Sequence, residues 1–523
     1  MNLLDPAASW LTLRGHDEHL SPGSVLDIVN PDVADLHAPR ADFRAAQYQL
    51  LIGLLQMALL PEDHDDWLVR WHNPPSRTEL EATLHGWQSA FQLDGEAPLF
   101  MQDQDPLLDG AEKPITDLLI DLGSDSNLFF KPSTDWQGLC PACTATALFT
   151  LQINAPSGGV GHRTGLRGGG PLTTLLMPDD PDSTLWQKLW LNVLPAEALK
   201  LDSLPQPHAT LLPWLGRTRT SDKTGVETLP DDMAPLHPYW SMPRRIRLST
   251  PSQGRHCALC QQAHAALYSH YRTRNYGINY TGPWQHPLTP YQHDPKDQKP
   301  PLSLKGSYAA RGYRHWLALC HGREKQPQVA NVVRDYRDHK RPALRQGRRP
   351  PRLWCFGYEM DNMKALAWHD SSLPLFNLQL EDPTWFTNQV QQVLDAAQMG
   401  ASILGDQVRK ARNQPGKEPA VEQSYWHASE TSFYALVQQL ATFDDASYLS
   451  VAEPLRQALR QWLHQTRKLL LDLFDQWVLA APSENMDLKE IIEAQQAVRS
   501  ATWHTKPFKA LWELARTAEE VDA

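Results

Sequence analysis

The segment after Pro383 constrains the fold most strongly, because its apolar residues recur every three or four positions. That spacing places them on one face of a helix, as in amphipathic helices packed on a core. Breaks fall at residues 414–416, 444–445 and 481–483. Four helices with short connections predict an antiparallel four-helix bundle over residues 378–523. The four stripes are Val390, Val393, Ala397, Leu404 and Val408; Phe433, Leu436, Leu440 and Phe443; Leu455, Leu459, Trp462, Leu469 and Leu473; and Leu488, Ile491, Val498, Leu511 and Leu514.

The residues before this segment show a mixed pattern. Residues 10–13 and 24–28 have the composition of short strands, whereas Ala41–Leu60 and Thr78–Leu93 have helical periodicity. Proline makes up 42 of 523 residues and recurs every few positions in 201–243 and 283–301, which predicts long surface connections within one domain. The predicted fold class is therefore α+β, with a large, irregular mixed α/β domain over residues 1–377 preceding the bundle.

The sequence also indicates the cellular compartment to expect. The first residues lack the basic and then apolar layout of a signal peptide, and the longest apolar stretch, Leu50–Leu60, is too short to span a bilayer. Six cysteines in a chain of this length do not make a secreted disulfide framework. We therefore expect a soluble, cytoplasmic protein with no membrane partner.

Four of the six cysteines form two C-x-x-C pairs, Cys140 with Cys143 and Cys257 with Cys260. Each pair can offer two thiolates to one tetrahedral metal ion, and zinc favours four sulfurs in a closed structural site. The pairs lie far apart in sequence, so a shared Zn²⁺ would staple distant loops together. Four buried free cysteines are the alternative, and a thioredoxin-like redox role has less support.

A glycine-rich segment follows the first pair, with seven glycines among the fourteen residues 157–170. Its spacing matches neither the P-loop nor the dinucleotide-binding fingerprint. Interleaved His162, Arg163 and Arg167 favour contact with a nucleic-acid backbone or groove floor. A structural loop of tight turns explains the glycines equally well.

The charge is unevenly distributed. The chain has 49 basic and 60 acidic residues, a net charge of −11, yet residues 334–352 hold eight Arg or Lys against two Asp. Arg272 and Arg274 lie beside Tyr268, Tyr271 and Tyr276 in a smaller cluster. Such local cations are what a phosphate-tracking groove needs, although a solvated loop is the simpler interpretation of the basic run.

A β-hairpin is predicted over 352–368, with residues 361–363 at its tip. Catalytic motifs are few. His-Asp dipeptides occur at His16, His64, His293 and His369, but no further ligands at helical spacing accompany them. A metal-dependent nucleic-acid hydrolase built on such a pair is one alternative function, and a purely protein-binding scaffold is another.

These features occur in the same order in a known family. The chain resembles the CasA family, the large subunits of type I-E CRISPR Cascade surveillance complexes, along nearly its whole length. The matching segments are Cys140-x-x-Cys143-Thr144-Ala145-x-Ala147-Leu148-Phe149, Asn154-Ala155-Pro156, Gly165-Leu166-Arg167-Gly168-Gly169-x-Pro171-x-Thr173-Thr174, Met1-Asn2-Leu3-Leu4, Asn73-Pro74 and Pro98-x-Phe100-Met101-Gln102.

The resemblance implies a non-catalytic DNA-recognition subunit. The mixed domain would meet the protospacer-adjacent motif (PAM) of double-stranded target DNA from the minor groove and promote duplex opening. The bundle would contact other Cascade subunits, which carry the crRNA, and the chain would help to recruit a separate helicase–nuclease. Base pairing with the guide would read the rest of the target.

The resemblance also assigns roles to residues. Ser157, Gly158, Gly159, Val160 and Gly161 would lie along the PAM minor groove, with Val160 where the family usually has glycine. The remaining assignments are as follows: Phe129 for the loop that engages PAM and the crRNA end, Arg274 or Asn275 for a groove-reaching lysine, Asp361, Asn362 and Met363 for a strand-separating wedge, and Cys140, Cys143, Cys257 and Cys260 for structural zinc. Arg163 is assigned to the groove because it is one of the basic residues interleaved with the glycines.

Overall fold

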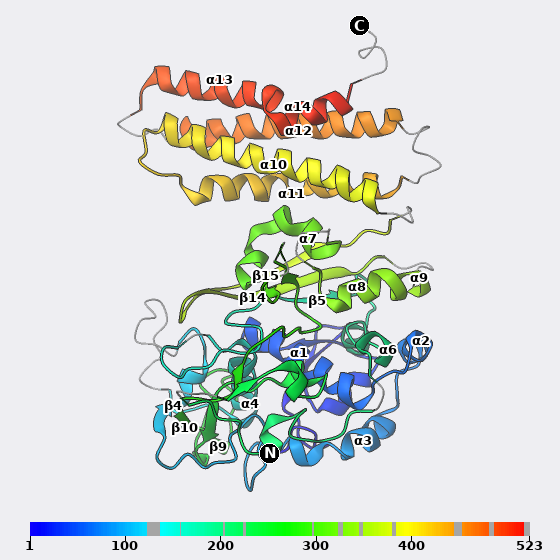
Figure 1. Ribbon diagram of the computed structural model, residues 1–523, viewed down its shortest axis with the longest axis vertical. Coiled ribbons are helices and arrows are strands. Elements are labelled where there is room, and N and C mark those ends of the chain that lie inside the picture. The colour runs from blue at the N-terminus through cyan, green and yellow to red at the C-terminus, as the bar shows by residue number, and fades with distance from the viewer. Residues whose placement is uncertain are drawn as a thin grey trace. The chain divides into compact units, whose positions relative to one another are not determined.

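The structure of the chain is a computed structural model (Figure 1). It describes all residues except 123–135, 157, 202–203, 223–225, 295, 297, 323–327, 345–348, 379–382, 444–451, 481–485 and 517–523. The chain forms two compact units. The mixed unit comprises Met1–Ala310 and Gly322–Ser372, and the helical unit comprises Arg311–His321 and Leu373–Ala523. A single division after residue 377 therefore does not describe the path of the chain, because Arg311–His321 belongs to the helical unit.

The core of the mixed unit is built around helix α1, Ala41–Ala58, which is buried along almost its whole length. Apolar residues are distributed around the helix, as expected of a central helix, and polar residues such as Asp42 and Gln56 are buried with them. The helix packs against α4 and α5. The helices of this unit are α1, α2 (His64–His72), α3 (Arg77–His85), α4 (Pro141–Asn154), α5 (Leu185–Trp190), α6 (Ala196–Leu199), α8 (Asn331–Asp335) and α9 (Arg341–Leu344).

The predictions for two elements of this unit were partly wrong. The helix expected over 78–93 ends at Gly86, and a short 3₁₀ turn follows it. Residues 24–28 were expected as a strand, but residues 25–29 form a 3₁₀ helix, because the Asp27 carboxylate accepts hydrogen bonds from the backbone N–H and the hydroxyl of Ser24. Such local polar bonds compete with strand formation.

The strands form small sheets, ordered β2-β1-β3, β4-β10-β7, β15-β14-β5, β11-β6, β12-β13 and β8-β9. The predicted hairpin is present as β14 and β15, and β14 pairs antiparallel with β5 so that Cys355 faces Thr174. This pairing places the hairpin beside β5, the strand that follows the glycine-rich segment in sequence. The strands are β1 (Leu11–Gly15), β2 (Leu20–Gly23), β3 (Val33–His37), β4 (Ala111–Pro114), β5 (Thr173–Met177), β6 (Glu227–Thr228), β7 (Arg245–Leu248), β8 (Ser252–Gln253), β9 (Ala266–Leu267), β10 (His270–Arg274), β11 (Asn279–Tyr280), β12 (Tyr291–Gln292), β13 (Leu302–Ser303), β14 (Arg352–Asp361) and β15 (Lys364–Pro374).

The first proline-rich stretch is not purely a surface connection. Trp214 and Trp240 from this stretch are fully buried, and their rings pack edge-on against Phe91. Large aromatic side chains gain enough from burial to draw an irregular segment into the core. The stretch belongs to the mixed unit, as expected, and does not link separate modules.

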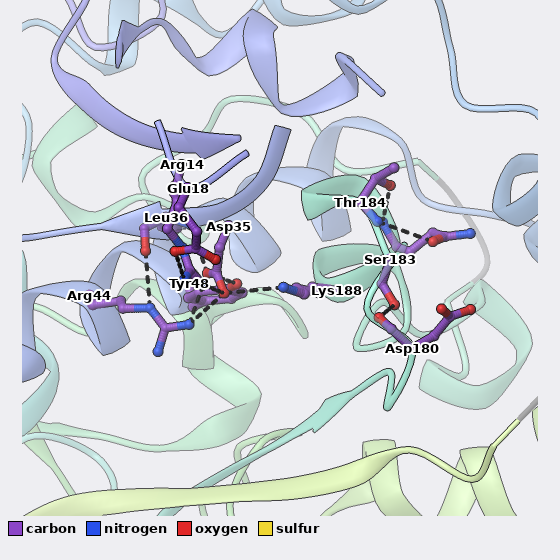
Figure 2. A network of polar contacts seen from close by, with 11 residues as sticks. Arg14, Glu18, Asp35, Leu36, Arg44, Tyr48, Asp180, Ser183, Thr184 and Lys188 are labelled. Atoms are coloured by element: carbon purple, nitrogen blue, oxygen red, sulfur yellow. Dashed lines mark hydrogen bonds and ion pairs between the residues drawn. The ribbon is translucent and has the colours of Figure 1, made fainter. Parts of the chain in front are cut away.

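A buried carboxylate joins the elements around α1 (Figure 2). Asp35 of β3 is 3% exposed and accepts hydrogen bonds from Arg44 at 2.8 and 2.9 Å, from Tyr48 at 2.7 Å and from Lys188 at 3.1 Å. Arg14 of β1 contacts it at 3.1 Å. Burial acts to raise the pKa of Asp35, but the charges of Arg44 and Lys188 outweigh burial and hold the pKa well below its usual range.

The described part of the helical unit contains α7 (Trp316–Cys320), α10 (Thr384–Ala411), α11 (Pro419–Ala441), α12 (Ala452–Val478), α13 (Leu488–His504) and α14 (Lys506–Leu514). The first three predicted stripes correspond to α10, α11 and α12. The fourth is two helices, because Pro507 occupies the first turn of a new helix, α14. In the described ranges, no helix is sufficiently long and apolar to cross a membrane.

Candidate functional site

The two C-x-x-C pairs meet in the mixed unit. The sulfur atoms of Cys140, Cys143, Cys257 and Cys260 all lie within 4.8 Å of one another, and the Cys140 and Cys260 sulfurs are 3.8 Å apart. Four sulfurs bound tetrahedrally at about 2.3 Å from zinc are about 3.8 Å apart. The first three cysteines are buried and Cys260 is half-buried. The donor set and its geometry therefore fit a closed structural zinc site, and no ion is part of the structure.

The backbone around the cluster favours thiolates. Cys140 caps the N-terminus of α4, where its sulfur accepts a hydrogen bond from the Cys143 N–H, and the Cys257 sulfur accepts one from the Cys140 N–H. The adjacent thiol of Cys140 raises the pKa of Cys143, whereas a hydrogen bond from Cys143 lowers the pKa of Cys260 to about 6. A bound dication would supply the positive charge that lets all four sulfurs ionise together.

Five of the residues assigned to DNA lie around one cavity of about 220 Å³, here called the glycine-loop cavity. Gly158, Gly161, Arg274, Asn275 and Met363 come from the glycine-rich segment, from the end of β10 and from the hairpin tip. Segments 200 residues apart in sequence therefore line a single depression of the mixed unit. The other lining residues are Lys113, Asp117, Leu119, Ile120, Leu151, Pro156, His162, Pro243, Arg244, Ile246, Tyr271, Thr273 and Gly277.

The loop over this cavity depends on its glycines. Gly159 and Gly161 have φ angles of +86° and +79°, a region that favours glycine. A Cβ atom on Gly161 would lie 2.8 Å from the Cβ of Asn275, whereas one on Gly159 would meet open space. The Asn275 amide donates a 2.9 Å hydrogen bond to the Val160 carbonyl, and the Val160 side chain is 80% exposed. The tip of the loop thus presents backbone and one apolar side chain to solvent.

The two predicted groove arginines differ in surroundings. Arg274 lines the cavity and forms an ion pair with Asp109. Arg163 points elsewhere, because its Nε donates to the Ser221 hydroxyl at 2.7 Å and its guanidinium lies 6.0 Å from the Tyr276 ring centroid.

The hairpin tip is exposed. Asn362 has a φ angle of +53°, and its amide donates to the Asp361 carboxylate at 3.1 Å. The Met363 side chain is 45% exposed and borders the glycine-loop cavity. An apolar side chain is therefore presented beside the glycine loop.

Two basic residues of the cavity, Lys113 and Arg244, were not predicted, and His162 of the glycine-rich segment lies beside them. The Arg244 guanidinium donates to the Pro156 carbonyl, and its Nε is buried without a hydrogen-bond partner. Burial lowers the pKa of Arg244 to about 10. Burial, and then the charges of Arg244 and Lys113, lower the pKa of His162. The charges of Arg244 and Lys113 therefore act on His162 in addition to burial. No sequence pattern marks Lys113 and Arg244, which come together only through tertiary folding.

Other predicted contacts differ. Arg167 is 4% exposed and donates to the hydroxyls of Thr173 and Thr289 at 2.9 and 3.1 Å, so it braces the core and does not face solvent. In the basic run, Lys340 is also buried, and Arg337 pairs with Asp338. Phe129, Ser157, Arg345 and Arg348 lie outside the described residues.

Three of the four histidines in His-Asp dipeptides form a side-chain contact with a residue elsewhere in the chain. His293 bonds Gln328 at 2.5 Å, His369 bonds Glu359 at 2.6 Å, and His64 bonds Asp335 at 2.7 Å. In none of the three is the partner the adjacent aspartate, on which the hydrolase alternative was based.

Comparison with known proteins identifies relatives. The model of a family described as CRISPR-associated protein Cse1 matches residues 2–473. The structure of Thermus thermophilus CasA (Cse1) aligns with 17% identity and a TM-score of 0.70 over 95% of this chain and 99% of that one. Thermobifida fusca Cse1 aligns with 16% identity and a TM-score of 0.67 over 99% of both. A chain of a CRISPR RNA-guided surveillance complex aligns with 14% identity and a TM-score of 0.69, covering 96% and 99%.

Proposed function

Because this chain belongs to the Cse1 (CasA) family of CRISPR-associated proteins, we propose that it is the non-catalytic DNA-recognition subunit of a type I-E Cascade complex. In this role it senses PAM through the minor groove, promotes duplex opening and helps to recruit a helicase–nuclease. The observation that carries the proposal is the glycine-loop cavity, around which a side-chain-poor loop, basic side chains and an exposed hairpin tip converge.

Each part of the cavity suits a bent or opened minor groove. A loop of glycines lets the protein backbone approach the groove closely. Lys113, Arg244 and Arg274 would neutralise phosphates, and each phosphate contact adds to the salt dependence of binding. The Arg274–Asp109 pair would open when a phosphate replaces Asp109.

The hairpin tip supplies the wedge in this proposal. Proteins that open the minor groove commonly insert an apolar side chain between base steps, at a cost of a few kcal/mol per step. Met363 provides the apolar group, and the Asn362 amide can replace hydrogen bonds of the separated bases. The helical unit would contact the other Cascade subunits and their crRNA. The Cys₄ cluster would hold structural Zn²⁺.

The test uses the complex assembled with this chain and a duplex target that carries PAM. Arg244→Gln and Lys113→Gln should each weaken target binding about tenfold and lower the salt dependence by about one phosphate contact. Arg334→Gln, an exposed arginine that does not line the cavity, is the matched control. Equal affinities for the two cavity variants and the control would reject the proposed interface.

Strand opening is measured separately with a fluorescent base analogue beside PAM. Met363→Ala should reduce unstacking, whereas Leu366→Ala should not, because Leu366 lies on the same hairpin, is 59% exposed and does not line the cavity. Cleavage of labelled DNA by the purified chain with Mg²⁺, Mn²⁺ or Ni²⁺ would instead favour a hydrolase.

A further inference from the structure

A second group of metal-ligating side chains lies in the mixed unit, apart from the cysteine cluster. His64, Asp335 and His339 each offer one ligand atom, and these atoms lie within 4.8 Å of one another. His64 Nε2 is 2.7 Å from Asp335 Oδ1, and the two imidazole ring centroids are 4.4 Å apart. Asp335 is buried, His64 is half-buried and His339 is exposed, so the group is open to solvent on one side.

A carboxylate outside this group orients the imidazole ring of His64. His64 is the first residue of α2, and its Nδ1 contacts the carboxylate of Glu197 in α6. Because a carboxylate on one ring nitrogen fixes the tautomer and the ring orientation, the other nitrogen is directed at a metal in many metalloprotein sites. Here Glu197 directs His64 Nε2 towards Asp335 and His339.

The carboxylate is also held in place. Lys340 Nζ lies 2.8 Å from Asp335 Oδ2 and donates to the backbone carbonyls of Val193 and Leu191 at 2.7 and 3.2 Å. This contact uses one carboxylate oxygen and leaves Oδ1 facing His64. A π-helical turn, Tyr336–Lys340, follows directly after Asp335 and carries His339. Such turns are uncommon and frequently mark functional sites.

We propose that His64 Nε2, Asp335 Oδ1 and a ring nitrogen of His339 bind one divalent transition-metal ion such as Zn²⁺, Co²⁺ or Ni²⁺, with solvent in the remaining positions. Two imidazoles and one carboxylate favour these ions over Mg²⁺ and Ca²⁺, which prefer oxygen ligands alone. On binding, the metal takes the place of the proton between His64 and Asp335, and that proton leaves to solvent.

The site differs from the cysteine cluster in a measurable way. Four thiolates bind zinc in a closed shell, whereas two imidazoles and one carboxylate leave open positions. Asp335 is already paired with Lys340, so the ligand set brings little net negative charge. We therefore expect weaker, exchangeable binding at this site, and it does not depend on the DNA-binding role proposed above.

The experiment dialyses the untagged, full-length chain against Co²⁺ under reducing conditions and counts bound metal per chain. The unaltered chain should bind a second equivalent beyond that held by the cysteines, with weak visible bands and no added thiolate-to-metal absorption. His339→Gln should weaken this second equivalent at least tenfold, and Glu197→Gln about tenfold. His16→Gln, an exposed histidine of another His-Asp dipeptide, should leave it unchanged.

Asp335→Asn leaves Lys340 buried without its partner, so this variant is interpreted only if its circular dichroism matches the unaltered chain. His339 is exposed, and its replacement provides the decisive measurement. Co²⁺ should raise the Tm of the unaltered chain and not that of His339→Gln. Absence of a second equivalent, or one that persists undiminished in His339→Gln, would show that His64 merely bridges two carboxylates, and the site would be rejected.

Discussion

Asp35 shows how one buried charge stabilises the scaffold that carries the cavity. Replacing it with alanine leaves Arg44 and Lys188 close together without their carboxylate. We predict that Asp35→Ala lowers the free energy of unfolding by about 3–5 kcal/mol, because removing one partner of a buried ion pair leaves an uncompensated charge. Denaturant titration measures this. Glu18→Gln, which removes an exposed partner of Arg14, should change the free energy by less than about 1 kcal/mol.

The lowered pKa of Asp35 also predicts that the stability of the protein depends on pH. The pKa of Asp35 is lower in the folded protein than in the unfolded chain, where it is about 3.9. Its contribution to stability is therefore complete above pH 5 and is lost as the pH falls below the unfolded value towards the folded one. The slope of stability against pH below 4 should be smaller in Asp35→Asn than in the unaltered chain.

Two glycines of the loop form a matched pair at the residue scale. Gly159 and Gly161 have similar positive φ angles, so alanine at either position costs about 1–2 kcal/mol of backbone strain. Only at Gly161 does the new methyl group also meet Asn275. We predict that Gly161→Ala weakens target binding by the assembled complex about tenfold more than Gly159→Ala. Equal losses would mean that backbone strain, and not the seating of the loop on Asn275, controls binding.

At the scale of elements, regular patterns were predictable from sequence and local polar bonds were not. The helical stripes after Pro383, the hairpin and the meeting of the two cysteine pairs follow from periodicity and ligand chemistry, both of which the sequence carries directly. Residues 25–29 became a 3₁₀ helix through one Ser24–Asp27 interaction, and Gly86 ended α3 early. Arg167 was predicted to contact nucleic acid, because the sequence does not indicate that its guanidinium donates to the hydroxyls of Thr173 and Thr289.

The cysteine cluster joins α4 to a loop more than one hundred residues later. Loop-closure entropy for a cross-link of that length is about 4–5 kcal/mol. We predict that zinc removal, or Cys257→Ser, lowers the free energy of unfolding by about this amount, with faster amide exchange in residues 136–144 and 256–268. Cys320→Ser, a buried cysteine outside the cluster, is the control. Equal metal content in Cys257→Ser and the unaltered chain would contradict the zinc assignment.

At the scale of the whole molecule, net charge is a poor guide to where nucleic acid would bind. The chain carries −11 overall, yet Lys113, His162, Arg244 and Arg274 face one cavity whose only acidic lining residue among those described is Asp117. In general, a net negative charge repels nucleic acid at long range, whereas a local group of cations can still attract phosphates. The basic run over residues 334–352 adds less positive charge to the surface than its composition suggests, because Lys340 is buried and paired with Asp335.

The chain also crosses between its two units more than once, and this has a testable consequence. Tyr313, from the segment Arg311–His321, is fully buried within the helical unit. Its ring stacks on Phe433 of α11 at a centroid distance of 4.1 Å, and its hydroxyl lies 2.8 Å from that of Ser429. Trp316 adds a 2.7 Å hydrogen bond to the Pro374 carbonyl. A segment that precedes the last part of the mixed unit in sequence is thus part of the helical core.

We predict that Tyr313→Ala lowers the stability of the helical unit by about 3–5 kcal/mol, as expected when a large aromatic side chain is removed from a core. Hydrogen exchange followed by mass spectrometry should show faster exchange in α10 and α11, with residues 41–58 of the mixed unit unchanged. Tyr313→Phe keeps the stacking and loses only the Ser429 hydrogen bond, so its cost should be about 1 kcal/mol. If Tyr313→Ala accelerates exchange equally in both units, they unfold as one, and stability in this family member is a property of the entire chain.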